Sequence, residues 1–277
     1  MEYLVVLVAA LFHAIWNSMI KNSGEKLLTL GYIRFVGLVY GLIVITTQPM
    51  IDLAAVPYLL IATIIHFVYF YCLLNAYKFG DFSQVYPISR GLAPLVVLSL
   101  GALIAGEYLN NWQLLGTLLI CLGVLSLAFG GDKKHQAKPL LFAIGTGLCI
   151  AGYTLTSGLG VRVAGNFLVY SGWLEVLTGA FTLIFIMAKK PGDIIPYSKS
   201  NYKGALSAGV LSISAYVAAL WAMSRVPMAP VAAVRETSII FAAIIGAVAM
   251  KEGFAAKRIV ASSLVVAGVV LLGLFGG

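Results

Sequence analysis

The sequence predicts an all-α membrane protein with ten transmembrane helices, arranged as two inverted five-helix repeats. Three observations predict this fold: the composition, a series of ten apolar runs, and a pattern of charged residues that occurs twice. Of the 277 residues, 61% are hydrophobic and 10% are charged, whereas a soluble domain carries roughly 25% charged residues. So few polar side chains cannot cover a water-soluble globule, and lipid must therefore surround much of the exterior.

The apolar runs have the length of membrane spans. A spanning helix needs about 20 mostly apolar residues. The connectors between the runs are short, and the longest extends from Lys189 to Lys203. No segment is polar enough to form a separate soluble domain, so the sequence excludes a catalytic head. The predicted spans are 3–20, 28–47, 56–77, 83–105, 112–130, 139–161, 166–188, 203–224, 228–250 and 256–275.

Charged residues recur at the same spacing in the two halves of the chain. Arg90 and Glu107 are separated by the same interval as Arg235 and Glu252, in register with the apolar runs. Because each repeat holds an odd number of spans, the second must lie upside down relative to the first. Inverted repeats are typical of secondary transporters, which bind their solute near the midplane between the halves. The predicted repeats are 1–131 and 139–277.

The basic residues outside the spans indicate an orientation in the membrane. The net charge is +8, but the lysines lie in short connectors, so we expect no nucleic-acid partner. Only Arg162 and Arg225 follow even-numbered spans. The positive-inside rule then places the odd connectors in the cytoplasm and both termini outside. The basic residues that follow odd-numbered spans are Lys21, Lys26, Lys78, Lys133, Lys134, Lys138, Lys189, Lys190, Lys199, Lys203, Lys251, Lys257 and Arg258.

The cysteines and the N-terminal run predict no further chemistry. Cys72, Cys121 and Cys149 lie inside apolar runs, at spacings that indicate neither a disulfide framework nor a metal site. We expect no cofactor and no metal. The first apolar run has no basic residues ahead of it and is long enough to remain as a span, so we expect no cleaved signal peptide.

Five charged residues lie inside predicted spans, where each costs roughly 2.5–3.5 kcal/mol and rarely faces lipid. They are Arg34, Arg90, Glu175, Arg235 and Glu236. Three positive and two negative charges suit an anionic or zwitterionic solute. Arg90 and Arg235 could instead pair with backbone carbonyls or a neighbouring glutamate. Arg34 and Glu175 occupy matching places in the two halves, so we expect them to pair, either around a zwitterionic solute or as a permanent salt bridge.

Prolines mark matching places in the fourth and ninth spans. Pro87, Arg90 and Pro94 share one helix face, and each proline removes an N–H and frees a carbonyl. Freed backbone is tolerated at membrane depth only beside protein or a water-lined cavity. Pro227 and Pro230 precede Arg235 in the second half. We expect the fourth helix to open beside the solute path, with a kink for packing alone as the alternative.

Further polar and aromatic residues share faces of apolar spans and should face inward, because lipid offers no hydrogen-bond partner. His13, Trp16 and Asn17 do so on the first span, and Ser212 and Tyr216 on the eighth. His66 and Tyr69 share a face of the third. Glycines at 116, 123 and 130 predict a close-packed seam, which we expect to face the rest of its own half or another subunit.

Three stretches resemble EamA-type proteins of the drug/metabolite transporter superfamily. They extend from His13 to Asn17, from Ala76 to Gly91, and from Arg235 to Glu252. The resemblance implies ten helices, alternating access, and a central cavity lined by helices one to four and six to nine. Relatives move amino acids, sugar phosphates, nucleotide sugars or other metabolites. Glu236 departs from the doubly basic pattern of the sugar-phosphate relatives. The resemblance also implies cytoplasmic termini, whereas the distribution of basic residues predicts that both termini lie outside. We follow the distribution of basic residues.

The sequence therefore predicts a secondary active transporter of a small zwitterionic or anionic, amino-acid-like metabolite, multi-pass in a bacterial inner (plasma) membrane. A proton is a candidate coupling ion, and Glu175, His13 or His66 could carry it. The protein would be a monomer or homodimer. The alternative is a proton-coupled exporter of aromatic cations, with Trp16, Tyr69, Trp173 and Tyr216 as a cage. No nucleophile–base pair or phosphate loop indicates an enzyme. The predicted solute-binding residues are His13, Trp16, Asn17, Arg34, His66, Tyr69, Tyr86, Arg90, Trp173, Glu175, Tyr216, Arg235 and Glu236.

Overall fold

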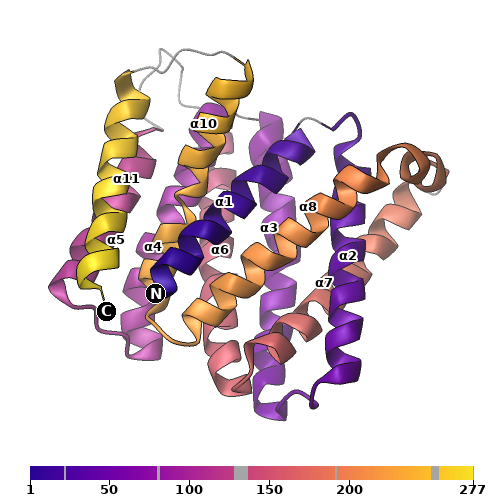
Figure 1. Cartoon of the computed structure of the whole chain (residues 1–277), viewed down its shortest axis with the longest axis horizontal. Helices are drawn as coiled ribbons and strands as arrows, with labels where there is room; N and C mark the ends of the chain where they lie inside the picture. Colours follow the sequence, from indigo (N-terminus) through magenta and orange to yellow (C-terminus); the bar gives the residue numbers. More distant parts are fainter. Residues whose placement is uncertain (22, 80–81, 128–136, 191, 251–255, 277) are drawn as a thin grey trace.

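The computed structural model describes residues 1–21, 23–79, 82–127, 137–190, 192–250 and 256–276. Every regular element in these ranges is helical (Figure 1). The helices are α1 (Glu2–Lys21), α2 (Lys26–Thr47), the 3-10 turn η1 (Leu53–Ala55), α3 (Val56–Phe79), α4 (Phe82–Ala105), α5 (Asn111–Ser126), α6 (Ala137–Ala164), α7 (Phe167–Lys189), α8 (Ile194–Met223), α9 (Met228–Arg235), α10 (Ser238–Met250) and α11 (Ala256–Phe275).

Seven of the described helices, α1 to α4 and α6 to α8, are long and apolar enough to cross a membrane. Two shorter apolar helices, Asn111–Ser126 and Ile259–Phe275, lie in α5 and α11. The prediction of an all-helical membrane protein is thus confirmed. The ninth predicted span is divided between α9 and α10, and the end of the fifth lies outside the described residues. The count of ten crossings therefore stays a prediction.

The helix contacts have the pattern of an internal two-fold relation. α2 packs against α7, α5 against α11, α1 against α8, and α3 against α6. If α1 to α5 are exchanged with α6, α7, α8, the α9–α10 pair and α11, the first two contacts map onto themselves and the last two onto each other. In Figure 1, α5 and α11 lie together at one side of the bundle, and α2 and α7 at the other. The two halves therefore meet along their whole width.

The glycine seam on α5 joins the two halves. A Cβ at Gly116 would lie 2.9 Å from the carbonyl oxygen of Gly268 in α11, and a Cβ at Gly268 would lie 2.6 Å from that of Gly116. At Gly123 the Cβ would lie 2.8 Å from the Ala261 oxygen. The expectation that this seam packs within its own half or against another subunit was wrong, because α11 of the other half covers it. Gly130 lies outside the described residues.

We expect Gly268→Val to destabilise the protein by about 1–3 kcal/mol, the usual range for overpacking a filled interface. The new side chain would meet backbone rather than a movable side chain, so α5 and α11 would have to separate. Gly273→Val is the matched control on α11, since nothing lies within 4 Å of its Cβ position. Thermal unfolding in detergent should show a lower midpoint for the first variant alone. Equal midpoints would contradict the close approach.

The fourth helix is not opened by its prolines. α4 is continuous from Phe82 to Ala105, with Pro87 and Pro94 inside it and buried, so the expected opening beside a solute path was wrong here. The helix interruption lies in the second half, between α9 and α10. There Glu236 donates its N–H to the Ala233 oxygen at 2.9 Å, and Thr237 to the Val234 oxygen at 3.1 Å. These tightened bonds turn the chain immediately after Arg235.

The main hydrophobic cluster runs through the bundle and includes the end that holds both termini. The first turns of α1 contribute Tyr3 and Val6, the first turn of α7 contributes Tyr170, and the α8–α9 junction contributes Met223 and Met228. Among the described residues, a separate cluster toward the opposite end has Ala76, Val85 and Ala143 as its buried members.

Candidate functional site

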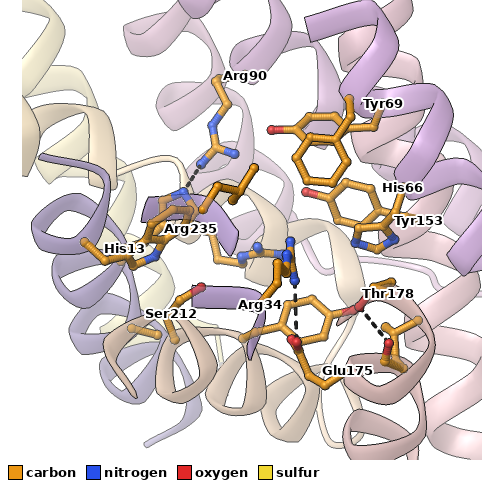
Figure 2. Close-up of a pocket in the computed structure, with 18 residues that line it drawn as sticks. His13, Arg34, His66, Tyr69, Arg90, Tyr153, Glu175, Thr178, Ser212 and Arg235 are labelled. Atoms are coloured by element: carbon orange, nitrogen blue, oxygen red, sulfur yellow. Dashed lines mark hydrogen bonds and ion pairs between the residues drawn. The ribbon is translucent and has the colours of Figure 1, made fainter. Parts of the chain in front are cut away.

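A cavity of about 110 Å³ lies between the two halves (Figure 2). It has room for several water molecules or for a small solute. It is lined from α1, α2, α3, α4, α6, α7, α8 and α9, the helices expected from the family resemblance. The lining residues are Ala9, Ala10, His13, Trp16, Leu30, Arg34, His66, Tyr69, Phe70, Arg90, Tyr153, Leu174, Glu175, Thr178, Ser212, Ala215, Tyr216 and Arg235.

Most of the predicted solute-binding residues line this cavity, and four do not. Asn17 donates from Nδ2 to the His13 carbonyl at 2.7 Å, and Trp173 packs against the hydrophobic core. The Arg90 guanidinium carbon lies 5.9 Å from the centroid of the Tyr86 ring. Glu236 forms an ion pair with the same arginine. The predicted residues that do line it are His13, Trp16, Arg34, His66, Tyr69, Arg90, Glu175, Tyr216 and Arg235.

The cavity also has lining residues that were not predicted as solute contacts. Ser212 was expected to face inward with Tyr216 but was not included among the solute contacts. Thr178 follows Glu175 by three positions, so helical spacing alone would have found it. Phe70 and Tyr153 gave no such signal, because aromatic residues are frequent throughout the spans. The small residues Ala9, Ala10 and Ala215 are indistinguishable in the sequence from other packing positions.

Arg90 and Glu236 form a buried ion pair between the halves. Arg90 Nε lies 2.7 Å from Glu236 Oε2, and the two side chains are 7% and 5% exposed. Arg90 Nη2 also lies 3.4 Å from Ser238 Oγ and 3.4 Å from His13 Nε2. A guanidinium only donates hydrogen bonds, so His13 Nε2 must carry its lone pair here. The pair ties α4 to the interruption between α9 and α10.

Arg34 and Glu175 also pair, as the sequence predicted. Arg34 Nη1 lies 3.5 Å from Glu175 Oε2, and the Glu175 side chain is 8% exposed. The Phe70 ring lies on the Arg34 guanidinium at 5.8 Å. A Cβ at Gly37 would collide with the Glu175 carboxylate, so this glycine in α2 provides the space that the carboxylate fills. The hydrogen bond is long, and both side chains still line the cavity.

Arg235 differs from the other two arginines because it makes no ion pair with a described residue. It is the last residue of α9 and lines the cavity (Figure 2). The carboxylate of its neighbour Glu236 lies against Arg90 instead. The three arginines and two glutamates leave one net positive charge at the site. That excess is located at Arg235, which suits a negatively charged group on a solute.

One wall of the cavity is aromatic. His66 stacks on Tyr153 with ring centroids 4.4 Å apart, and Tyr69 meets the same tyrosine edge-on at 5.9 Å. His66 Nδ1 lies 2.7 Å from the Ala62 carbonyl oxygen. A carbonyl only accepts, so Nδ1 carries the proton and Nε2 is left as an acceptor. This wall presents ring faces and an acceptor nitrogen, both of which suit an ammonium group.

A second polar cluster lies at the terminal end, outside the cavity. Arg162 at the end of α6 donates from Nε to the Met223 carbonyl at 2.9 Å and from Nη2 to Val226 at 3.0 Å. It also pairs with Glu107, whose Oε2 accepts the Met228 N–H at 2.8 Å. Gly106, with φ of 62°, makes the turn that delivers Glu107. This Glu107–Arg162 cluster ties four chain segments together.

At the opposite end a weaker pair joins two connectors. Lys190 Nζ donates to Glu25 Oε2 at 2.7 Å, and this hydrogen bond raises the pKa of Lys190 above its usual value. Glu25 is exposed and Lys190 is partly exposed, so the pair contributes little to stability. Among the described residues, the Glu107–Arg162 pair is thus more buried than the Glu25–Lys190 pair.

A helical bundle with long apolar helices and a charged cavity between two related halves defines a multi-span membrane transporter. Both halves match one family, over residues 1–129 and 137–274, and the chain belongs to the EamA-like transporter family. It is accordingly a transporter and not an enzyme. A crystal structure described only as that of a protein is 18% identical, with a TM-score of 0.73, covering 99% of this chain and 95% of its own. That likeness concerns the fold alone. No curated protein matches the sequence.

Proposed function

We propose that this chain is a secondary active transporter of a small carboxylate-bearing metabolite, zwitterionic or anionic and amino-acid-like. The observation that carries the proposal is Arg235, an arginine at the cavity without an ion-pair partner among the described residues. Arg235 is half-buried, a cation partly withdrawn from water without a counter-charge is unfavourable, and a solute carboxylate would supply the missing charge through paired N–H donors. An amine on the same solute would face Glu175 and the aromatic wall.

The test is binding and uptake by the purified protein in sealed proteoliposomes. The panel contains amino acids, monocarboxylates and dicarboxylates, sugar phosphates and aromatic cationic dyes, each with and without a pH gradient. We expect carboxylate-bearing solutes to be taken up and to compete with one another. A response to the pH gradient would identify the proton as the coupling ion. Uptake of dyes without any carboxylate transport would overturn the proposal in favour of the cation exporter, which the arginines of the cavity disfavour.

Alternating access between two inverted halves, 1–131 and 139–277, completes the proposal, with ten crossings of a bacterial inner membrane. The ninth crossing would consist of α9 and α10, and the tenth of α11. The Glu107–Arg162 cluster lies at the terminal end, which the main hydrophobic cluster includes, and this supports a conformation closed at that end. Transport would then require the cluster to break, because it ties the α4–α5 turn to the start of α9.

We expect Arg162→Gln to open the terminal end more often. The variant removes two hydrogen bonds to backbone carbonyls and the pairing with Glu107, and one such contact corresponds to roughly a tenfold change in an equilibrium constant. The readout is the labelling rate of a cysteine placed at Leu174 in a chain without its native cysteines. Lys190→Gln, at the opposite end, is the control and should not change that rate. Equal rates in all three proteins would contradict the assigned gate.

We expect the termini to lie outside the cell and the basic connectors in the cytoplasm. Asp52 lies between α2 and α3, and Lys199 lies near the start of α8; both are exposed. A single cysteine would be placed at each position in turn and treated with an impermeant thiol reagent in intact cells. Labelling at Asp52 alone supports the orientation that the basic residues predict. Labelling at Lys199 alone would reverse it, and permeabilised cells control for the reactivity of each site.

A further inference from the structure

A second cavity lies between α2, α7 and the first turn of α8. Its volume is about 190 Å³, larger than that of the central cavity, and the two cavities share no lining residue. None of the described residues that line it is charged, so it does not suit the carboxylate that Arg235 would hold. We call it the outer groove, and its walls include Gly31, Tyr32, Phe35, Leu183, Ile186 and Met187.

The outer groove is apolar and faces lipid. Phe35 and Met187 are 49% and 51% exposed, on helices that are long and apolar enough to cross a membrane. These helices, α2 and α7, lie together at one side of the bundle (Figure 1). Tyr32 contributes the only hydroxyl among the side chains that line the groove. A cavity holds water only where several polar groups bind it, so a hydrocarbon chain suits this groove better than water does.

One end of the outer groove lies beside basic residues. Lys190 follows the groove-lining Ile186 by four positions, on the same side of α7. Lys190 Nζ lies 2.7 Å from Glu25 Oε2, which joins the end of α7 to the start of α2. Lys26 and Lys189, the chain neighbours of that pair, are exposed and make no ion pair with a described residue. Two lysines without counter-charges therefore lie at this end of the groove.

Tyrosines mark the level of the lipid head groups at the same end. Tyr197 Oη lies 2.6 Å from Thr29 Oγ1, and the Tyr197 and Tyr32 ring centroids are 5.9 Å apart. Tyrosine rings are enriched at the membrane–water interface, where one end of the ring is apolar and the other is wet. The flanking segments 23–30 and 189–203 carry five lysines and two carboxylates. This excess of positive charge at head-group level is complementary to anionic lipids.

We propose that the outer groove binds an anionic phospholipid, with an acyl chain against Phe35 and Met187 and the phosphate at Lys26 and Lys189. The lipid belongs to the leaflet on the side of the basic connectors. The apolar lining accounts for the chain, and the two lysines without counter-charges account for the head group. Because the outer groove is separate from the central cavity, this site does not depend on the proposed function.

The experiment measures lipid affinities from the concentration dependence of thermal stabilisation of the detergent-solubilised protein. The probes are phosphatidylglycerol, phosphatidylcholine with the same acyl chains, and glycerol phosphate, which has no chain. Each lysine near an anionic head group contributes about fivefold in affinity. We expect phosphatidylglycerol to bind roughly 25-fold more tightly than phosphatidylcholine, for two such lysines, and glycerol phosphate to give no stabilisation. Lys26→Gln with Lys189→Gln should reduce the affinity for phosphatidylglycerol to that for phosphatidylcholine.

Lys78→Gln with Lys138→Gln is the matched control for charge. Both lysines are exposed and follow odd-numbered spans, but neither lies next to the outer groove in the chain, so the lipid affinities should not change. Met187→Trp would fill the groove and should weaken the binding of both lipids. Ile184→Trp is its control, because Ile184 is 60% exposed on the same helix and does not line the groove.

Equal binding of the two phospholipids by the wild-type protein would overturn the proposal. An equal loss of selectivity in both lysine double variants would also overturn it, because the attraction would then be spread over the whole basic surface. Unchanged lipid affinities in Met187→Trp would show that no acyl chain occupies the groove. A change of oligomeric state in Met187→Trp alone would mean that a second copy of the chain covers the groove in place of lipid. None of these outcomes bears on solute transport.

Discussion

Arg235→Gln is expected to lower the affinity for carboxylate solutes about 10- to 100-fold and to leave the folded state intact. Hydrogen bonds to a charged group are worth about 1.5–3 kcal/mol, which gives this range. Arg235 makes no ion pair with a described residue, so its removal leaves no carboxylate without a partner. The two measurements are solute affinity, from thermal stabilisation by ligand, and the unfolding midpoint without ligand.

Arg225→Gln is the control for this substitution. Arg225 is exposed and lies over the Trp221 ring at 4.8 Å, outside the cavity. It should change neither the solute affinity nor the unfolding midpoint. Unchanged affinity in Arg235→Gln would move the carboxylate contact elsewhere and reduce Arg235 to a structural role. A large loss of stability would mean that Arg235 has a protein partner after all.

Arg90→Met, unlike Arg235→Gln, should destabilise the folded protein, by about 3–5 kcal/mol. Arg90 and Glu236 are both buried, and their ion pair is 2.7 Å long. Removal of the arginine would leave the Glu236 carboxylate in a low-dielectric interior without its counter-charge. The free energy of unfolding, from SDS titration in mixed micelles, would show the loss as an earlier unfolding transition.

The double variant Arg90→Met/Glu236→Met separates the pair from the packing of Arg90. Replacement of both partners by apolar side chains of similar volume removes the unpaired charge, and such replacements are often neutral. We therefore expect the double variant to recover most of the stability that Arg90→Met loses. If the double variant is as unstable as the single one, the loss comes from packing or from the contacts of Arg90 with His13 and Ser238.

Arg90 and Arg235 illustrate how far the sequence could go. The repeat placed them at equivalent positions in the two halves. For both, the sequence left open whether the arginine binds solute or pairs with backbone carbonyls or a neighbouring glutamate. Arg235 is followed by Glu236, whereas Arg90 is followed by Gly91. The chain turns after Arg235 through tightened hydrogen bonds, and Glu236 pairs across the interface with Arg90. Equivalent positions in the repeat thus acquire different partners.

The polar faces of single helices were predicted more reliably than contacts between helices. Helical spacing placed His13 with Trp16, and His66 with Tyr69, and all four line the cavity. The same spacing placed Asn17 with them, but its amide is used by the His13 carbonyl. Trp173 lies two positions before Glu175, on a different part of the α7 surface, and packs in the core. A single-helix pattern shows which face is polar but not which neighbour covers it.

The sequence by itself determined the membrane class, the helical content, the family and the placement of charges within apolar spans. These follow from composition and from spacing along one chain, because hydrophobic length and helical periodicity are local properties. Only the tertiary structure decided that α11 covers the glycine seam of α5 and that α4 continues through its prolines. It also decided which of the three cavity arginines, Arg235, makes no ion pair with a described residue. Each of these depends on contacts between segments far apart in the chain. The packing of the two halves places the Glu236 carboxylate against Arg90 of α4 rather than against its chain neighbour Arg235.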